Sequence, residues 1–233
     1  SWVSNENRET ILSFLRRKLN LGGTVYISYN IHPGWSQLVP LRDLLAYHMN
    51  TLSPPGYPVA DKIKQAMEYV DNLFETQPLL LQSNPKMKQT LDQMLTQDPR
   101  YLAHEYFNQE WAPTNFGEFS KNMQKAKLSY AASAELKDVI SDVNLSQEQL
   151  DIIANTKDPV LCEILRDMCT DRAFRKDYWV KGALKLSGYN RYQMLRRIEV
   201  IQVLDASKFN LNVSSARGGV QLNEKIYVPI LGF

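Results

Sequence analysis

Cysteine, histidine and long apolar runs are scarce in this chain of 233 residues. It has two cysteines, three histidines and a net charge of +2, and no apolar stretch approaches the ~18 residues of a membrane span. The near-neutral charge argues against a dedicated nucleic-acid binder. The composition is 44% hydrophobic and 22% charged. These values are ordinary for a globular protein, so the chain can bury a core without disulfides or metals.

The signatures of a complete active site are also missing. The sequence has no glycine-rich phosphate or dinucleotide loop and no serine or cysteine in a nucleophile motif. Its histidines, His32, His48 and His104, lack the spacing of a helix metal site. We therefore expect no metal site and assign no catalytic residue. Cys162 and Cys169 lie ~10 Å apart along an expected helix, too far for one disulfide. They indicate two reduced thiols and a cytoplasmic protein.

The amino-terminal region reads as half of a βαβ unit. A helix is expected over residues 5–18, capped by Ser4, and Gly22-Gly23 then turns the chain into a short β-branched strand over 24–29. The preceding strand of the unit is missing, and so are a signal peptide and an initiator methionine. We expect a fragment of a longer protein, in which this strand has the pattern of a central parallel strand. Both of its edges are expected to be unpaired here.

Most of the remaining chain is expected to be helical. The proline- and glycine-rich segment 53–58 is the strongest break and a domain hinge. Helices are expected from about residue 40, over 59–76, 84–97, 98–107 and 116–127, from 146, and over 158–169. A short strand is expected over 128–133. Alternation at 210–214 and at 225–230, with a turn at Gly218-Gly219, indicates a β hairpin.

Three segments carry side chains of the types that bind ligands or fill the space between helices. Tyr29, Asn30 and Trp35 directly follow the buried strand, where ligands bind in open α/β sheets. The alternative is a turn in which Trp35 packs on a neighbouring helix. Residues 172–185 interleave basic and aromatic side chains, a pattern that can bind phosphates or acidic surfaces. More often the pattern belongs to a helix with one apolar and one solvated face. The aromatic loop 106–113 is expected to be a helix-packing wedge.

Several blocks of the sequence carry a family resemblance. They are Trp2-Val3-Ser4, Gly22-Gly23, Tyr29-Asn30-x-x-Pro33-Gly34-Trp35, Tyr101-Leu102-Ala103-His104-Glu105-Tyr106-Phe107-Asn108 with Trp111 and Pro113, Leu128-Ser129-Tyr130, Asp158-Pro159-Val160-Leu161, and Phe174-Arg175-Lys176-Asp177. Together they resemble bacterial class I AdoMet-dependent methyltransferases that carry a methyltransferase regulatory domain. That family includes protein-lysine methyltransferases of rickettsial outer-membrane proteins. The resemblance covers nearly the whole chain.

The resemblance implies a mainly α (α+β) fold in three parts. Residues 1–52 would be the C-terminal remnant of a class I methyltransferase domain, a helix and a strand of its Rossmann-like sheet. Residues 53–205 would be the helical regulatory domain, and residues 206–233 would begin a C-terminal β-containing domain, here a short hairpin.

The implied function is that of a regulatory and substrate-recognition segment of a methyltransferase whose parent methylates protein lysine. S-adenosyl-L-methionine (AdoMet) is implied as the parent's cofactor. None is expected to bind this chain, because the family's AdoMet motif lies upstream of the matching segment. Tyr29, Asn30 and Trp35 would lie next to the substrate site. The implied partners are the upstream catalytic half, a protein substrate and a second copy of the chain. Two alternatives stay open: a stand-alone helical adaptor without catalysis, and a parent that methylates a small molecule.

Overall fold

The computed structural model describes residues 2–184, 186–199, 201, 203, 205 and 208–231. The strands are β1 Thr24–Asn30, β2 Leu128–Ser133, β3 Phe174–Lys181, β4 Asn212–Ser215 and β5 Gly218–Gln221. The helices are α1 Asn5–Lys18, the 3-10 turn η1 Ser36–Leu38, α2 Val39–Thr51, α3 Val59–Glu75, α4 Leu79–Ser83, α5 Lys86–Met94, α6 Pro99–Glu105, α7 Phe116–Lys125, α8 Leu136–Val139, α9 Ser141–Asn144, α10 Gln147–Ala154, α11 Pro159–Cys169, α12 Gly188–Leu195 and α13 Glu224–Leu231. The mainly α (α+β) class is confirmed.

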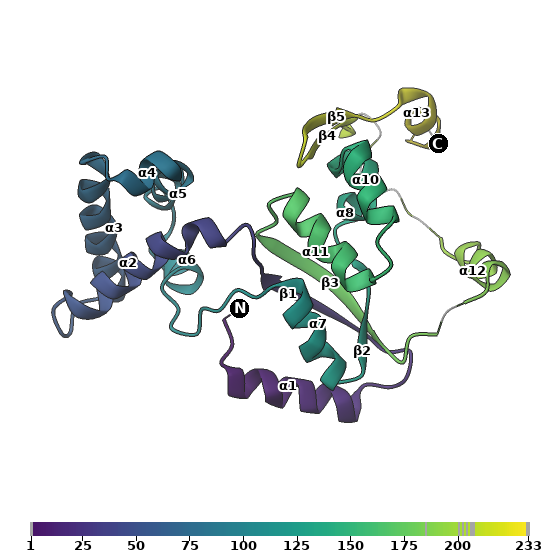
Figure 1. The fold of residues 1–233 in the computed structure, drawn as a ribbon, viewed down its shortest axis with the longest axis horizontal. Coiled ribbons are helices and arrows are strands. Elements are labelled where there is room, and N and C mark those ends of the chain that lie inside the picture. Colours follow the sequence, from purple (N-terminus) through teal and green to yellow (C-terminus); the bar gives the residue numbers. More distant parts are fainter. Residues whose placement is uncertain are drawn as a thin grey trace.

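Two hydrophobic cores organise the molecule. Helices α2–α6 gather at one end as a helical lobe, while β1, β2 and β3 form a sheet beside α1, α7 and α11 (Figure 1). The lobe's core includes Leu45, Ile63, Leu91 and Leu102, all fully buried. A second core lies between the sheet and its covering helices. The chain passes from β1 into the lobe and returns to the sheet through the segment after α6, so both connections lie at the same end of β1.

Side-chain oxygens cap the helices at the starts that the sequence predicts. Ser4 accepts a backbone N–H of α1, Asp98 one of α6, Asn115 one of α7 and Asp158 one of α11. Ser146 forms a reciprocal capping box at the start of α10. These contacts satisfy amides that lack partners within the helix, so local sequence decides where each helix begins.

The sheet corrects one expectation about residues 172–185. β3 lies between β1 and β2 and pairs antiparallel with both. Residues 174–181 are therefore a strand rather than a helix. Along β3, Arg175, Asp177, Trp179 and Lys181 are buried and alternate with more exposed neighbours. Burial alternates along β3 as in an ordinary strand. Because several of the buried residues are charged, hydrophobicity does not alternate in the same way, and the sequence does not show the strand.

The pairing with β3 also corrects the expectation that both edges of β1 are unpaired. Thr24 to Asn30 pair in register with Val180 to Phe174, so one edge of β1 is filled from within the chain. The sheet joins residues on both sides of the predicted boundary after residue 52. The three-part domain division itself stays a prediction.

The two faces of the sheet differ. Tyr29 of β1 and Trp179 of β3 face α1, α7 and α11, where they join Leu12, Phe116 and Met123 in the second core. On the opposite face Tyr26 and Tyr178 lie side by side, 5.8 Å between ring centroids. Their residues are 52% and 43% exposed, so this face keeps an aromatic surface open to solvent.

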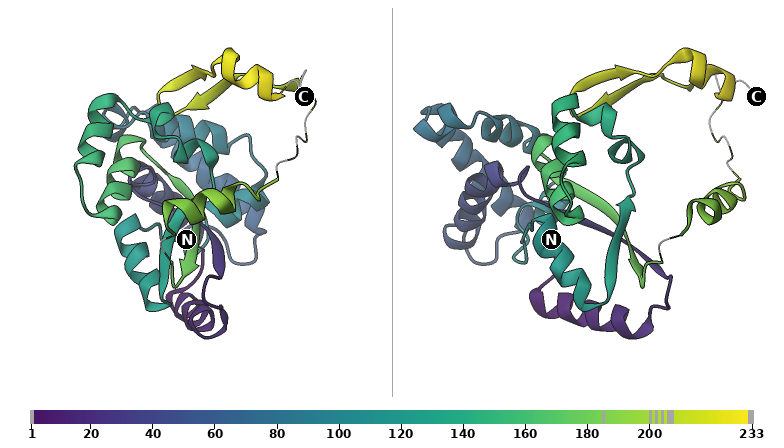
Figure 2. Two further views of the ribbon diagram at one scale, coloured as in Figure 1. Left: turned by 90° about the vertical axis from the view of Figure 1, so that its right-hand side faces the viewer. Right: turned by 45° about the vertical axis from the view of Figure 1, so that its right-hand side comes forward.

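The carboxyl-terminal region differs from the expected hairpin in detail. β4 pairs with β5 through a turn at Ala216-Arg217, and Gly218 begins β5 instead of forming the turn. Residues 225–230 lie in α13 rather than in a strand. Asn223 explains this difference, because its side chain accepts the Lys225 amide at 3.0 Å and so caps a helix. The hairpin lies over the end that holds α8–α10, while α12 stands apart from the sheet (Figure 2).

Candidate functional site at the end of β1

The carboxyl end of β1 is its most buried part. Exposure falls along the strand, and Tyr29 and Asn30 are 2% and 1% exposed. Beyond the strand, Ile31 donates its amide to Ala173 and Gly34 donates to Arg172, both at 2.9 Å. These bonds hold the turn after β1 against the start of β3.

Glycine is required in that turn. A Cβ at Gly34 would lie 2.6 Å from backbone atoms of Arg172 and Ala173. No side chain fits there unless the backbone moves, so the sequence Pro33-Gly34 fixes the direction in which the chain leaves the sheet.

Tyr29 is anchored within the second core. Its hydroxyl donates to Asp177 at 2.5 Å, and its ring stacks on Phe119 at 3.8 Å. Burial, together with the charge of Asp177, raises the pKa of Tyr29 far above its ordinary range. The hydroxyl therefore stays protonated and holds the end of β1 against β3.

Asn30 connects β1 to the end of α6. Its side-chain amide donates to Glu105 Oε1 at 3.4 Å, and its backbone carbonyl accepts the Thr114 amide at 3.3 Å. Thr114 in turn accepts the His32 amide at 2.9 Å. The segment that returns from the helical lobe thus runs parallel to the residues that follow β1, bridging at Ile31 and Thr114.

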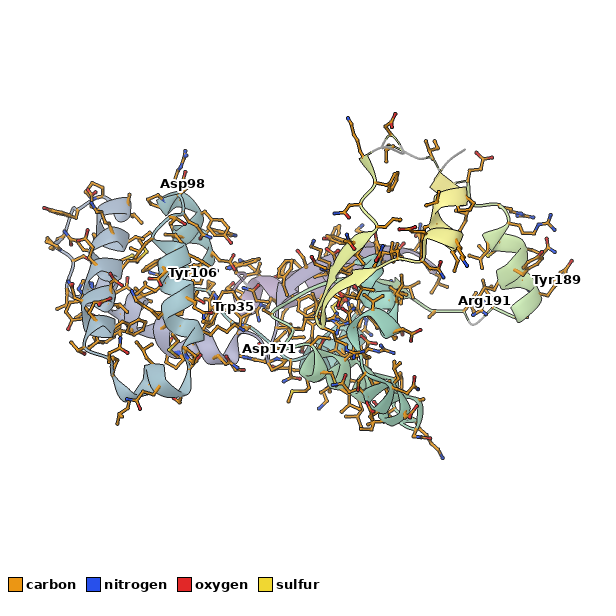
Figure 3. All side chains as sticks on the ribbon, turned by 90° about the horizontal axis from the view of Figure 1, so that it is seen from above. Trp35, Asp98, Tyr106, Asp171, Tyr189 and Arg191 are labelled. Atoms are coloured by element: carbon orange, nitrogen blue, oxygen red, sulfur yellow. The ribbon has the colours of Figure 1, made fainter. Side chains whose placement is uncertain are left out.

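Trp35 lies in the core of the helical lobe. Its ring meets those of Tyr106 and Trp111 at 5.5 and 5.4 Å. Arg42 fixes the same loop, because its guanidinium donates to the carbonyls of Tyr106 and Asn108 at 3.0 and 2.6 Å. Figure 3 shows Tyr106 in the lobe and Trp35 on the side of the lobe that faces the sheet. The 106–113 loop is thus a packing wedge, as the sequence predicts.

The structure brings the three predicted residues to one end of β1 but directs them differently. Tyr29 faces the core under α7, Asn30 faces Glu105, and Trp35 packs into the lobe. Their place beside a substrate site stays a prediction. Sequence reasoning missed the role of Glu105, although it lies within one of the blocks that carry the family resemblance. Nothing local marks it, since its contact with Asn30 spans 75 residues.

A cavity of about 520 Å³ lies beside the outer edge of β1. Its wall is largely apolar and comes from α1, β1, α7 and the loop before α7. The lining includes Ile11, Leu15, Ile27, Ser28, Phe119 and Met123. The cavity therefore lies on the side of β1 that faces away from β3.

Arg175 neutralises a buried group of carboxylates instead of binding an external anion. Its guanidinium is fully buried and pairs with Asp167 at 2.7 Å, and with Glu163 and Asp177 at 2.8 Å. Burial raises the pKa of Asp167 to about 6, against the opposing charge of Arg175. Asp167 Oδ2 is buried without a hydrogen-bond partner, which agrees with this direction. The idea that residues 172–185 bind phosphate gains no support at this position.

Other features of the described residues bear on classes of function. No helix among them is long and apolar enough to cross a membrane. Within the same residues, no group of three or more histidine, cysteine, aspartate or glutamate side chains could hold a metal ion. Cys162 and Cys169 are free thiols of intermediate exposure.

Comparison with known proteins places this chain among longer relatives. Residues 98–181 match the family model described as a predicted methyltransferase regulatory domain. The uncharacterized protein sll1526 of Synechocystis sp. is 34% identical over 230 residues, which are 99% of this chain and 45% of that protein. The uncharacterized protein RP789 of Rickettsia prowazekii is 26% identical over 204 residues, which are 86% of this chain and 36% of that protein. The chain spans less than half the length of these relatives.

Solved structures of longer proteins are also similar to this chain. PKMT2 from Rickettsia typhi in complex with AdoHcy is 25% identical, with a TM-score of 0.63 over 81% of this chain and 35% of that one. Another structure of PKMT2 from Rickettsia typhi has a TM-score of 0.62 over 92% of this chain and 41% of that one. At 22% identity, it shows a shared fold alone.

Proposed function

We propose that this chain is the regulatory and substrate-recognition segment of an AdoMet-dependent methyltransferase that methylates protein lysine. The match of residues 98–181 to the model of a predicted methyltransferase regulatory domain supports this proposal. The similarity to PKMT2 in its AdoHcy complex supports the cofactor class. The lysine acceptor rests on the resemblance of the sequence to protein-lysine methyltransferases.

One observation carries the proposal most directly. The regulatory-domain segment from Glu105 to Thr114 lies against the carboxyl end of β1 through contacts with Asn30, Ile31 and His32. Ligands of open α/β sheets bind at the carboxyl ends of strands. In this proposal the methyl acceptor enters at the carboxyl end of β1, next to this segment of the domain.

The outer edge of β1 supplies a docking surface for the upstream catalytic half. Hydrogen bonds to β3 at Gly23 and Ile31 fix the alternation of the ladder. The backbone N–H and C=O groups of Tyr26 and Ser28 therefore point away from β3, toward the cavity under α1. A strand that precedes α1 in the parent would pair here, because right-handed βαβ crossovers place such strands side by side.

Methyl transfer needs positioning more than acid–base chemistry. AdoMet supplies an activated methyl group, and the accepting lysine amine must be neutral when it attacks. We assign no AdoMet contact to this chain, which lacks the glycine-rich motif. Its contribution is to hold the acceptor at the end of β1 and to exclude water from that end with the packed rings of Trp35, Tyr106 and Trp111.

Two further expectations belong to this proposal. Cys162 and Cys169 are free in the structure, as in a reducing compartment, and we place the protein in the cytoplasm. The open aromatic face at Tyr26 and Tyr178 offers a second contact area for the catalytic half or for a second copy of the chain.

The test compares Ser28→Pro with Ser28→Ala in the full-length protein. Proline removes the outward N–H of Ser28 and is tolerated where an edge amide faces away from the ladder. Alanine keeps this amide. With isotope-labelled AdoMet and protein acceptors, mass spectrometry should find added methyl groups on lysine for the wild type and Ser28→Ala. The rate of this transfer should be at least about tenfold lower for Ser28→Pro. The free energy of unfolding of the 233-residue chain should change little.

Each remaining outcome refutes a part of the proposal. Equal transfer by the two variants would contradict docking along β1. Methylation of small acceptors but never of lysine would favour the small-molecule parent, and no transfer at all would favour the adaptor.

A further inference from the structure

Glu105 is a half-buried carboxylate on which the charges of His104 and of the amino terminus act, but it is not held in an ion pair by a described residue. It is the last residue of α6, and its Oε1 accepts the buried amide of Asn30. No described lysine, arginine or histidine forms an ion pair with it. Asp167 and Asp177, by contrast, share the guanidinium of Arg175. Glu105 therefore stands apart from the carboxylates that stabilise the fold.

This position is unfavourable for an isolated negative charge. Burial raises the pKa of Glu105, although the bond from Asn30 and the charges of His104 and the amino terminus partly oppose this shift. The end of a helix exposes backbone carbonyls, which offer no compensation to an anion. A cation placed against the carboxylate would remove this cost. Unfavourable charges of this kind, held in place by the surrounding fold, occur preferentially at functional sites.

Two tyrosines, Tyr101 and Tyr106, lie close to Glu105 in the sequence at the end of α6. Tyr101 lies one helical turn before Glu105 and is 50% exposed. Burial raises the pKa of Tyr106 to about 12, and the charges of Tyr101 and Glu105 raise it further. Trp2 packs on the ring of His104 at 5.0 Å beside them. Aromatic faces next to a carboxylate attract a primary ammonium group.

We propose that Glu105 recognises the side-chain ammonium of the lysine acceptor, with the rings of Tyr101 and Tyr106 around its aliphatic chain. This inference rests on the proposed function for its choice of substrate. The amine is bound in its protonated form at the carboxyl end of β1, beside Asn30. Glu105 thereby makes this end of the sheet selective for a cationic acceptor over an apolar one of the same length.

The direct test is binding to the 233-residue chain, acetylated at its amino terminus so that its own ammonium does not compete. The probes are N-acetyl-lysine methylamide and the matched norleucine compound, which lacks the charge. The Trp2 indole resonance should shift saturably with the lysine probe and remain in place with the norleucine probe. Glu105→Gln should weaken lysine binding at least about tenfold. The control Glu110→Gln, an exposed glutamate on the next loop, should bind as the wild type does.

Equal shifts with the two probes, or equal binding by Glu105→Gln and the wild type, would overturn the inference. Thermal melting of both variants shows whether they fold. In the full-length protein, Glu105→Gln should raise KM for lysine acceptors about tenfold with a smaller change in kcat, and Glu105→Asp should recover part of it. If Glu105→Gln methylates lysine with an unchanged KM, the role of Glu105 is refuted but the proposed function is not. If lysine binding depends on Glu105 but no methyl transfer occurs, the proposed function is refuted and the lysine-binding site at Glu105 is not.

Discussion

Replacing Arg175 with methionine removes the fully buried cation from the charge cluster between β3 and α11. The guanidinium bonds Glu163, Asp167 and Asp177, and it lies 4.3 Å from the ring centre of Phe116. Methionine retains an apolar contact with this ring but leaves the three carboxylates without their shared partner. The variant therefore tests whether ion pairing holds β3 against α11.

The structure sets the size of the effect. Breaking a buried ion pair by removing one partner costs roughly 3–5 kcal/mol. A protein of this length loses roughly 2–4 °C of melting temperature per kcal/mol, so we expect a fall of roughly 6–20 °C. The control is Lys176→Met, the next residue on the opposite face. Lys176 pairs with Glu135, and both side chains are more than a third exposed, so its loss should change the stability little.

Urea unfolding followed by circular dichroism, with calorimetry for the melting temperature, measures both variants. The deficit of Arg175→Met should also shrink as the pH falls from 7 to 5, because protonation removes the uncompensated charge of the carboxylates. If Arg175→Met and Lys176→Met lose the same small amount of stability, the buried network does not hold β3 in place and this reasoning is wrong.

Three further predictions follow from the same structure. Gly34→Ala should destabilise the chain by more than ~1 kcal/mol in urea unfolding because its Cβ would meet backbone, whereas Gly188→Ala, which meets open space, should cost nothing; equal effects would contradict the close approach at Gly34. Because the pKa of Asp167 is raised to about 6, the stability it contributes is complete below about pH 4 and lost as the pH rises through 6. Asp167→Asn should flatten this dependence between pH 5 and 7, and an unchanged slope would count against it. Calorimetry should find no measurable AdoMet binding to the isolated chain, and saturable micromolar binding would overturn this.

Local sequence was sufficient for much of the fold. Ser4, Asp98 and Ser146 mark helix starts because a capping oxygen acts on amides two or three residues away. The strand at β1 follows in the same way from its β-branched residues and the Gly22-Gly23 turn. The alternation of residues 225–230 predicts a strand, whereas the cap at Asn223 begins the helix α13 there.

Features that depend on distant partners escaped the sequence. β3 buries Arg175 and Asp177, which pair with each other, and Arg175 also pairs with Glu163 and Asp167 of α11. The candidate site shows the same limit. The position of Asn30 after a buried strand pointed to this end of the sheet, but its partner Glu105 is 75 residues away in the sequence. Periodicity and composition carry no record of such contacts.

Hydrogen exchange at the amides of β1 tests most directly whether this chain completes the sheet of a longer methyltransferase. Val25 and Ile27 bond to β3 in the chain alone, whereas Tyr26 and Ser28 point to the outer edge. In the full-length protein the account predicts that exchange at Tyr26 and Ser28 slows by at least roughly 100-fold, while Val25 and Ile27 change little. Equal exchange at Tyr26 and Ser28 in the chain and in the full-length protein would contradict it.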